Sequence, residues 1–171
     1  ITELNLKTKQ MKNYILKSII LILFVSLFTS CSNNDDQEAF EPVTIDLIGL
    51  GLDINDTSFT QQGFNFTVFQ VRSNEASIPG IALAFPNSQS DPSTLTLNLS
   101  GITGINRIIT NISDFGGGEL ELLNNGQIIE TINVNGNQPE FSDYSFTING
   151  REIDAFRYKS LEGIIRSIRL E

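Results

Sequence analysis

The hydrophobic and polar positions of the chain form short β-type runs separated by turn residues. Between Thr94 and Leu99, leucine alternates with threonine and asparagine, so Leu95 and Leu97 share one face of a predicted strand. No stretch keeps the apolar stripe of an amphipathic helix. Further β-type runs are Val43–Leu52, Phe64–Val71, Ile78–Phe85 and Arg107–Ile112. The pattern predicts one all-β domain over residues 43–171, folded as an antiparallel β-sandwich.

Inside the run Phe64–Val71 the alternation shifts phase at Val68 and Phe69, which predicts a β-bulge at these two residues.

The Asn125-Gly126 pair predicts a β-hairpin, because a two-residue type I′ turn requires positive φ at both central positions. The register around it pairs Leu122 with Ile129 and places Glu121 directly opposite Glu130. Like charges opposed across a sheet destabilise it by about 0.2–1 kcal/mol. Two interpretations follow: the carboxylates hold a cation such as Ca²⁺, or they are solvated and splay apart.

The Asn149-Gly150 pair predicts a second hairpin of the same kind. Its register pairs Phe146 with Ile153 and Tyr144 with Ala155, which gives one coherent apolar face. The other face groups aromatic and acidic side chains, namely Phe156, Tyr158, Asp143 and Asp154.

A second candidate metal site is the segment that contains Asp53, Asn55 and Asp56. These residues offer oxygen ligands at close spacing, as calcium-binding loops do. The segment lacks the glycine and the distant glutamate of an EF-hand, so an Asx turn is the alternative. The fold requires no cofactor, and structural calcium is the one metal that the sequence indicates.

The segment from Met11 to Asp36 has the layout of a secretory signal. Lys12 and Lys17 precede an apolar run from Ile19 to Phe28, which is about half of the 20 residues that a membrane-spanning helix needs. Small residues then lead to Cys31, the only cysteine of the chain. The sequence Phe-Thr-Ser-Cys resembles the lipobox of bacterial lipoproteins, with phenylalanine in place of the usual leucine. The resemblance implies that the cysteine is lipidated and becomes the mature N-terminus; a cleaved signal with an incidental cysteine and an uncleaved anchor are the alternatives.

This interpretation divides the chain into three parts. Residues 1–30 are an upstream extension and a signal peptide, residues 31–42 are a flexible acidic tether, and residues 43–171 are the folded domain. The acidic tether resembles the surface-export signals of Bacteroidota lipoproteins, and Ser32 differs from the aspartate that retains lipoproteins at the inner membrane. We therefore expect a lipid-anchored outer-membrane protein, with the cell surface favoured over the periplasmic side.

Charge and composition limit the partners and the catalytic mechanisms that the chain can use. The whole chain has a formal net charge of −9. Four of its eleven basic residues and one of its twenty acidic residues precede Cys31, so the remainder carries −12. Such a field repels nucleic acid and anionic lipid head groups. The chain has no histidine, which removes the common nucleophile activation by histidine and the usual proton shuttle near pH 7.

Two C-terminal segments resemble the second half of galactose-binding-like jelly rolls: ITNISDFGGGELELLNNGQIIETI and EFSDYSFTINGREIDAFRYKSLEGIIRSIRLE. The resemblance implies a carbohydrate-binding or cell-surface interaction module, often with a structural calcium, and carries no catalytic motif. The chain has no tryptophan for a sugar-stacking platform. That leaves as candidate ligand-binding residues Tyr144, Phe156 and Tyr158, with Asp143 and Asp154 beside them.

Together these observations predict a lipid-anchored, non-catalytic β-sandwich module that binds a glycan or a partner protein. The alternative is a structural or assembly subunit of an outer-membrane complex that uses exposed sheet edges and has no small-ligand site. An enzyme is not expected, because the chain offers no recognisable nucleophile.

Overall fold

The computed structural model describes residues 40–74, 78–83, 91–137 and 139–171. The chain divides into two units, residues 1–37 and 38–171, and everything described below belongs to the second unit. The predicted signal peptide, Cys31 and the tether up to residue 39 lie outside the described residues. Within the described ranges, no helix is long and apolar enough to cross a membrane.

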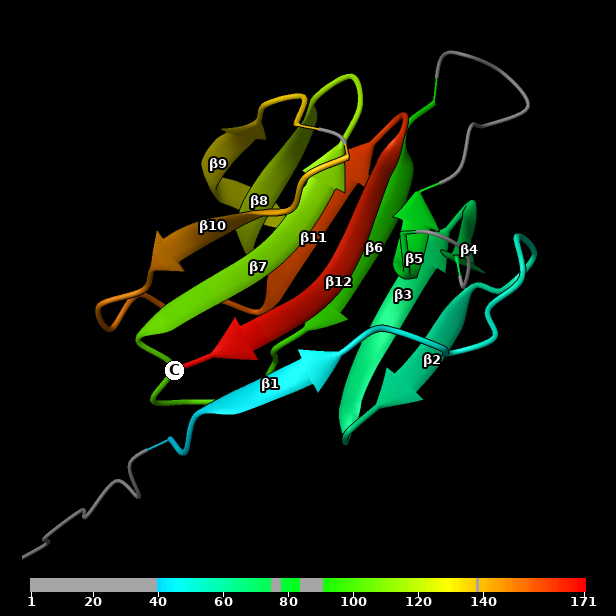
Figure 1. The fold of residues 1–171 in the computed structure, drawn as a ribbon. Coiled ribbons are helices and arrows are strands. Elements are labelled where there is room, and N and C mark those ends of the chain that lie inside the picture. The colour runs from blue at the N-terminus through cyan, green and yellow to red at the C-terminus, as the bar shows by residue number, and fades with distance from the viewer. Residues whose placement is uncertain (1–39, 75–77, 84–90, 138) are drawn as a thin grey trace, which may run out of the picture. The chain divides into compact units, whose positions relative to one another are not determined.

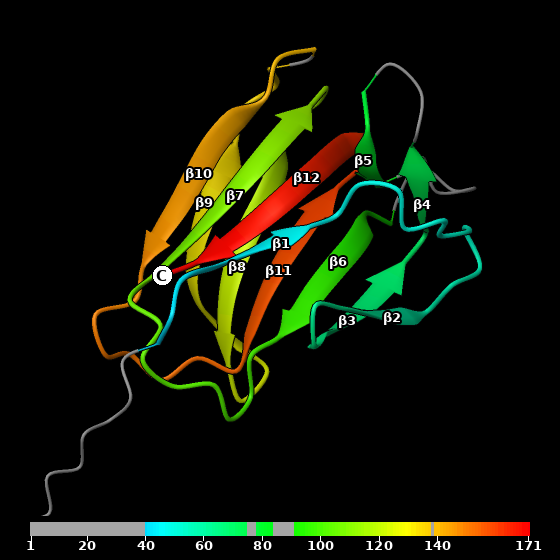
Figure 2. The same cartoon turned by 60° about the horizontal axis from the view of Figure 1, so that its bottom comes forward.

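The described residues form two six-stranded sheets, in which all strand pairs are antiparallel (Figures 1 and 2). Sheet A has the order β10 (Ser142–Thr147), β7 (Arg107–Asp114), β12 (Gly163–Leu170), β5 (Gly80–Leu83) and β4 (Val71–Asn74), and β1 (Val43–Asp46) pairs with β12 next to β5. Sheet B has the order β2 (Ser58–Gln61), β3 (Phe64–Phe69), β6 (Ser93–Asn98), β11 (Ala155–Ser160), β8 (Gly118–Asn124) and β9 (Gln127–Val134). The predicted antiparallel β-sandwich is confirmed.

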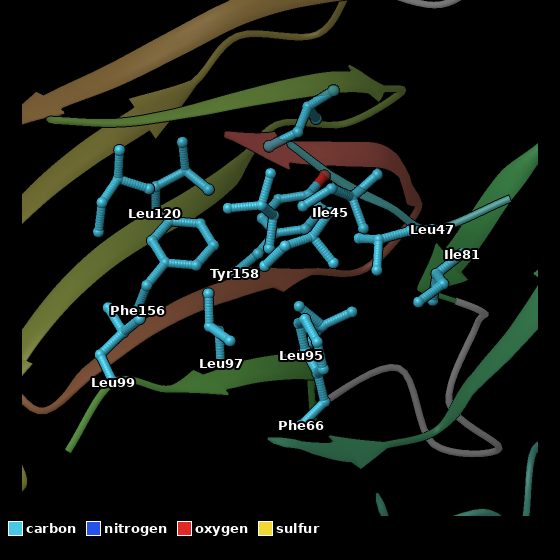
Figure 3. Packing of buried hydrophobic residues seen from close by; sticks show 14 of the residues in the cluster. Ile45, Leu47, Phe66, Ile81, Leu95, Leu97, Leu99, Leu120, Phe156 and Tyr158 are labelled. Atoms are coloured by element: carbon cyan, nitrogen blue, oxygen red, sulfur yellow. The ribbon is translucent and has the colours of Figure 1, made fainter. Parts of the chain in front are cut away.

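The core lies between the two sheets and follows from the alternation of the strands. In β6, Leu95 and Leu97 are fully buried, whereas Thr94 and Thr96, which alternate with them, face away from the core. Figure 3 shows these leucines packed with Phe156 and other buried side chains of both sheets. The alternation of β3, β6 and β11 leaves the other face of sheet B for less buried, mostly polar side chains.

The run Phe64–Val71 is divided between the two sheets. Val68 of β3 faces the core, Phe69 faces outward, and Gln70 then adopts a φ of 55°. The chain leaves sheet B at this residue and continues as β4 in sheet A. The predicted bulge at Val68 and Phe69 is wrong, because the pairing of β3 with β6 stays regular through Phe69 and the change of sheet causes the shift of phase.

The hairpin at Asn125-Gly126 is confirmed, with φ of 50° and 72° at its two central residues. Its predicted register is wrong beyond the first pairs, because Ile129 is an extra residue on β9 at a β-bulge. Leu122 therefore pairs with Glu130, and Glu121 pairs with Thr131. Since a one-residue shift reverses the direction of every later side chain, Glu121 and Glu130 lie on opposite faces of sheet B.

Asn149-Gly150 also has positive φ at both residues, 48° and 75°, but the predicted hairpin is wrong. The strand before this turn, β10, pairs with β7 of sheet A, and the strand after it, β11, pairs with β6 and β8 of sheet B. Phe146 pairs with Ile108 instead of Ile153. Its ring packs edge-on against Phe156 with 6.3 Å between ring centroids, so the two strands contact each other between the layers.

Candidate functional site

The strand registers of sheet B align outward-facing polar side chains in rows that cross the sheet. One row runs over five strands and contains Phe69, Thr94, Lys159, Glu119 and Asn133. The neighbouring row contains Thr67, Thr96, Arg157, Glu121 and Thr131. Strands in a sheet lie about 4.8 Å apart, so the first row, which we call the Phe69 row, extends about 19 Å across the sheet.

Four charged side chains in the centre of these rows form a connected network, which we call the charged ladder: Glu119, Glu121, Arg157 and Lys159. Arg157 donates through Nε at 2.6 Å and Nη2 at 2.5 Å to Oε2 of Glu121. The ammonium of Lys159 lies 2.7 Å from Glu121 Oε1 and 2.7 Å from Glu119 Oε2. Hydrogen bonds to Glu119 and then to Glu121 raise the pKa of Lys159 above its usual value.

Burial within the charged ladder is uneven. The Glu121 side chain is 1% exposed although it projects from the outer face, whereas the Glu119 side chain is 47% exposed. Arg157 and Lys159 therefore cover Glu121 while keeping part of their own surface in solvent. The ladder is locally neutral, with two acids and two bases, in a chain whose formal net charge is −9.

Phe69 adds an aromatic surface to the same face. Its side chain is 49% exposed at the end of β3. An exposed ring offers a flat apolar platform that the apolar face of a ligand can cover. The sequence pattern did not identify Phe69 as a site residue, because the phase shift at Val68 and Phe69 also fits a β-bulge. The informative signal was the strict alternation with Val68, which places Phe69 on the outer face.

A cleft with a volume of about 460 Å³ opens at one end of the Phe69 row. Glu119, Lys159 and Asn133 of the row line it, together with Gly117 and the exposed side chain of Leu161. The cleft thus combines charged groups, an amide and an apolar side chain, which is the mixture found in small-molecule sites.

A buried carboxylate lies next to this cleft, at the end of β7. Asp114 is fully buried, and its Oδ2 accepts hydrogen bonds from Tyr158 Oη at 2.5 Å and from Ser160 Oγ at 2.8 Å. The backbone N–H of Gly117 donates to Asp114 Oδ1 at 2.7 Å. Burial and then the negative charge of Asp114 raise the pKa of Tyr158 above its ordinary value of 10.0. Because Asp114 belongs to sheet A and Tyr158 to sheet B, the network joins the two layers.

The ligand-binding residues predicted from the sequence do not form one cluster. Phe156 and Tyr158 are fully buried in the core and present no ring face to solvent (Figure 3). Tyr144 is partly buried against the core. The predicted grouping of Asp143 with Asp154 is wrong, because Asp143 lies on β10 of sheet A, whereas Asp154 directly precedes β11 of sheet B. Asp143 accepts a hydrogen bond from Asn111 Nδ2 at 2.7 Å, and Asp154 accepts one from the backbone N–H of Asn125 at 2.6 Å.

The candidate metal ligands lie in three separate places. Asp53 and Asp56 form a compact loop in which Asp53 Oδ1 accepts hydrogen bonds from Asn55 N at 3.1 Å and from Asn55 Nδ2 at 2.8 Å. Glu121 belongs to the charged ladder, whereas Glu130 pairs with Arg151 at 2.6 Å. The predicted pairing of the two glutamates is therefore wrong. Within the described ranges, no group of three or more Asp, Glu, Cys or His side chains is placed to hold a metal.

No protein-family model matches the chain, and no curated protein matches it. Among solved structures, a family 29 carbohydrate-binding module complexed with mannohexaose matches at a TM-score of 0.50 and 12% identity, over 77% of this chain and 92% of that one. The chain has the β-sandwich fold of such modules. A variant of a family 29 module complexed with cellulohexaose matches at a TM-score of 0.49 and 12% identity, over 75% of this chain and 90% of that one. A family 36 carbohydrate-binding module of a multidomain xylanase from the hindgut metagenome of Trinervitermes trinervoides matches at a TM-score of 0.47 and 9% identity, over 77% of this chain and 97% of that one.

Proposed function

We propose that this protein is a lipid-anchored, non-catalytic binding module of the cell envelope, and that it binds a glycan on the outer face of sheet B. The observation that carries the proposal is the Phe69 row, in which an exposed aromatic ring and paired charged groups share one face of the sandwich. The shared fold with a module complexed with mannohexaose supports the same class of ligand.

The charged ladder keeps hydrogen-bonding capacity for such a ligand. Lysine has three N–H donors, and two of those of Lys159 are directed at carboxylates. Arginine has five donors, and the contacts of Arg157 with Glu121 use two of them. The ion pairs fix the orientation of the remaining donors before a ligand arrives, which lowers the entropic cost of binding. Hydroxyl groups of a sugar can accept these charge-assisted hydrogen bonds.

Affinity electrophoresis in gels that contain soluble glucomannan, xylan or mannan tests this proposal. We expect retardation on at least one polysaccharide, and a loss of affinity of about tenfold in Phe69→Ala, because truncation of an aromatic contact removes a large share of binding energy. Phe115→Ala is the matched control, since Phe115 is 66% exposed and lies outside the Phe69 row. Equal retardation of wild type and Phe69→Ala contradicts the proposed site.

The anchoring part of the proposal rests on Cys31 and is tested separately. Several acyl chains, each CH₂ contributing about 0.8 kcal/mol, tether a soluble domain stably. We expect that Cys31→Ser abolishes palmitate labelling and releases the protein from the membrane fraction. Membrane association that persists in Cys31→Ser contradicts lipid anchoring through this residue. Protease accessibility of intact cells then distinguishes the cell surface, which we favour, from the periplasmic side.

One observation favours the alternative function as an assembly subunit. The edge strand β9 exposes Ile128 by 50% and Ile129 by 42%, and exposed apolar residues on a sheet edge favour pairing with another protein. Crosslinking of wild type and Ile129→Lys on intact cells separates the two functions. A crosslinked envelope protein that Ile129→Lys loses, together with no retardation on any polysaccharide, favours assembly over glycan binding.

A further inference from the structure

A second cavity lies at the opposite end of sheet B from the cleft. Its volume is about 410 Å³, which falls within the range of about 300–1,000 Å³ found for small-molecule sites. The side-chain amides of Gln62, Asn65 and Asn98 line it, and none of the described side chains that line it is charged. Its apolar wall consists of Phe40, Phe64 and Ile102. We call it the amide-lined cavity.

Two of these amides have a fixed orientation. The backbone N–H of Ser100 donates to Asn98 Oδ1 at 2.9 Å, and the backbone N–H of Asp46 donates to Gln62 Oε1 at 2.9 Å. A backbone N–H can only donate, so the atom that it contacts must be the amide oxygen. The NH₂ groups of Asn98 and Gln62 are left as donors. Among the residues that the structure describes, no acceptor is paired with either group.

The walls of the cavity are held in place by the surrounding chain. Gln62 and Gly63 form the turn between β2 and β3 with φ of 50° and 84°, a geometry in which asparagine is usually preferred at the first position. Glutamine has the longer side chain and reaches Asp46 of β1, and Gln61 Nε2 donates to the carbonyl of the same Asp46 at 2.9 Å. The turn is therefore clamped onto β1, which preorganises the cavity.

We propose that the amide-lined cavity binds an N-acetylated sugar unit. The acetamido carbonyl is a pure acceptor that matches the NH₂ donors of Asn98 and Gln62, and its methyl group fits the apolar wall of Phe40 and Phe64. The described lining offers no charged side chain to pair with a carboxylate or an ammonium group, so it favours a neutral ligand group. The site is distinct from the Phe69 row: Asn98 and Thr94 are four residues apart on β6, which is about 13 Å along the strand.

Titration of the full chain with N,N′,N″-triacetylchitotriose, followed by NMR of side-chain amide groups, tests this site directly. We expect the NH₂ resonances of Asn98 and Gln62 to shift on binding. Asn98→Asp keeps an oxygen acceptor for the N–H of Ser100 but lacks the NH₂ donors, and should weaken binding about tenfold. Ser58→Asp is the control, because it adds the same charge at an exposed position that does not line the cavity. Unchanged melting temperatures show that both variants are folded.

The possible results decide between the sites. Cellotriose, which carries hydroxyl groups in place of acetamido groups, should shift neither resonance at millimolar concentration. Equal binding of cellotriose, unchanged binding in Asn98→Asp, or no shift of Asn98 and Gln62 at millimolar chitotriose overturns this proposal. Loss of chitotriose binding in Phe69→Ala alone also overturns it, and leaves the proposed function standing. Conversely, polysaccharide retardation that Phe69→Ala leaves unchanged contradicts the Phe69 row without affecting the amide-lined cavity.

Discussion

Among the residues that the structure describes, two carboxylates are almost completely removed from solvent, and the groups around them differ in charge. Asp114 lies between the sheets and accepts hydrogen bonds from Tyr158, Ser160 and the backbone of Gly117, all of which are neutral donors. Glu121 projects from the outer face of sheet B and is covered by Arg157 and Lys159, which are both cations. The first carboxylate joins the two layers of the sandwich, whereas the second organises a surface.

This difference in surroundings indicates different roles, with Asp114 contributing to the stability of the fold and Glu121 to the chemistry of the surface. A buried carboxylate is tolerated only when hydrogen bonds satisfy it, and the neutral donors around Asp114 are themselves fixed by the packing of both sheets. The cations around Glu121 remain partly solvated, with 29% exposure for Arg157 and 25% for Lys159. We therefore expect changes near Asp114 to affect folding strongly and changes near Glu121 to affect surface chemistry more than stability.

Gly163→Ala should produce the largest effect, because it inserts a methyl group into the Asp114 network. A Cβ at Gly163 would lie 1.9 Å from Tyr158 Oη and 2.8 Å from Asp114 Oδ2, so these hydrogen-bonded side chains must shift. We expect a loss of about 3 kcal/mol in the free energy of unfolding, measured by urea denaturation. Gly116→Ala is the matched control, since a Cβ there has no neighbour within 4 Å. Similar stabilities of the two variants contradict the close packing around Asp114.

Tyr158→Phe should cost about 2 kcal/mol, because it removes one donor and leaves the buried carboxylate of Asp114 less satisfied. Tyr144→Phe serves as the comparison. The Tyr144 hydroxyl accepts a single 3.3 Å hydrogen bond from the backbone of Asn135, so its loss should change stability by less than about 0.5 kcal/mol. Equal effects in the two variants would show that the Asp114 network does not depend on Tyr158.

Glu121→Gln tests the other carboxylate and should have a smaller effect on folding. It removes the negative charge that Arg157 and Lys159 share and keeps one amide oxygen as an acceptor, and we expect a loss of about 1–2 kcal/mol that shrinks at high salt. Glu130→Gln breaks the more exposed pair with Arg151 and should cost less than about 0.5 kcal/mol. If Glu121→Gln lowers stability as much as Gly163→Ala does, the division between a structural and a surface carboxylate is wrong.

The parts of the structure that were predictable from the sequence are those that depend on neighbouring residues in the chain. The alternation of Leu95 and Leu97 with threonines is local, and it predicted both the strand and the buried face correctly. The positive φ values at Asn125-Gly126 and Asn149-Gly150 are also local, and the Asn-Gly pairs indicated them. The partner of β11 is not a local property, because an apolar face suits a neighbour in the same sheet and a facing sheet equally well.

The candidate site could not be predicted from the sequence, because it also depends on how distant strands pair. The Phe69 row joins residues of five strands whose order in sheet B differs from their order in the sequence, so no spacing along the chain brings Phe69 near Lys159. Glu121 was singled out, but the bulge at Ile129 changed its partner from Glu130 to Thr131. Adjacent isoleucines at positions 128 and 129 fit either register, and the choice depends on the whole sheet.

The smallest expected effect is the dependence of stability on alkaline pH, which reports on Asp114 through the ionisation of Tyr158. Tyr158 has a raised pKa in the folded protein, because of burial and the charge of Asp114, so only the unfolded chain ionises this residue near its ordinary value of 10.0. The corresponding stability is fully present below pH 10 and is lost as the pH rises above it. One such tyrosine should lower the free energy of unfolding by about 0.4 kcal/mol at pH 10 relative to pH 8. Urea denaturation across this interval should show the decrease in wild type and a smaller one in Tyr158→Phe. Identical pH dependence in the two proteins would mean that Tyr158 titrates alike in the folded and unfolded states, and that Asp114 and Tyr158 are not buried together.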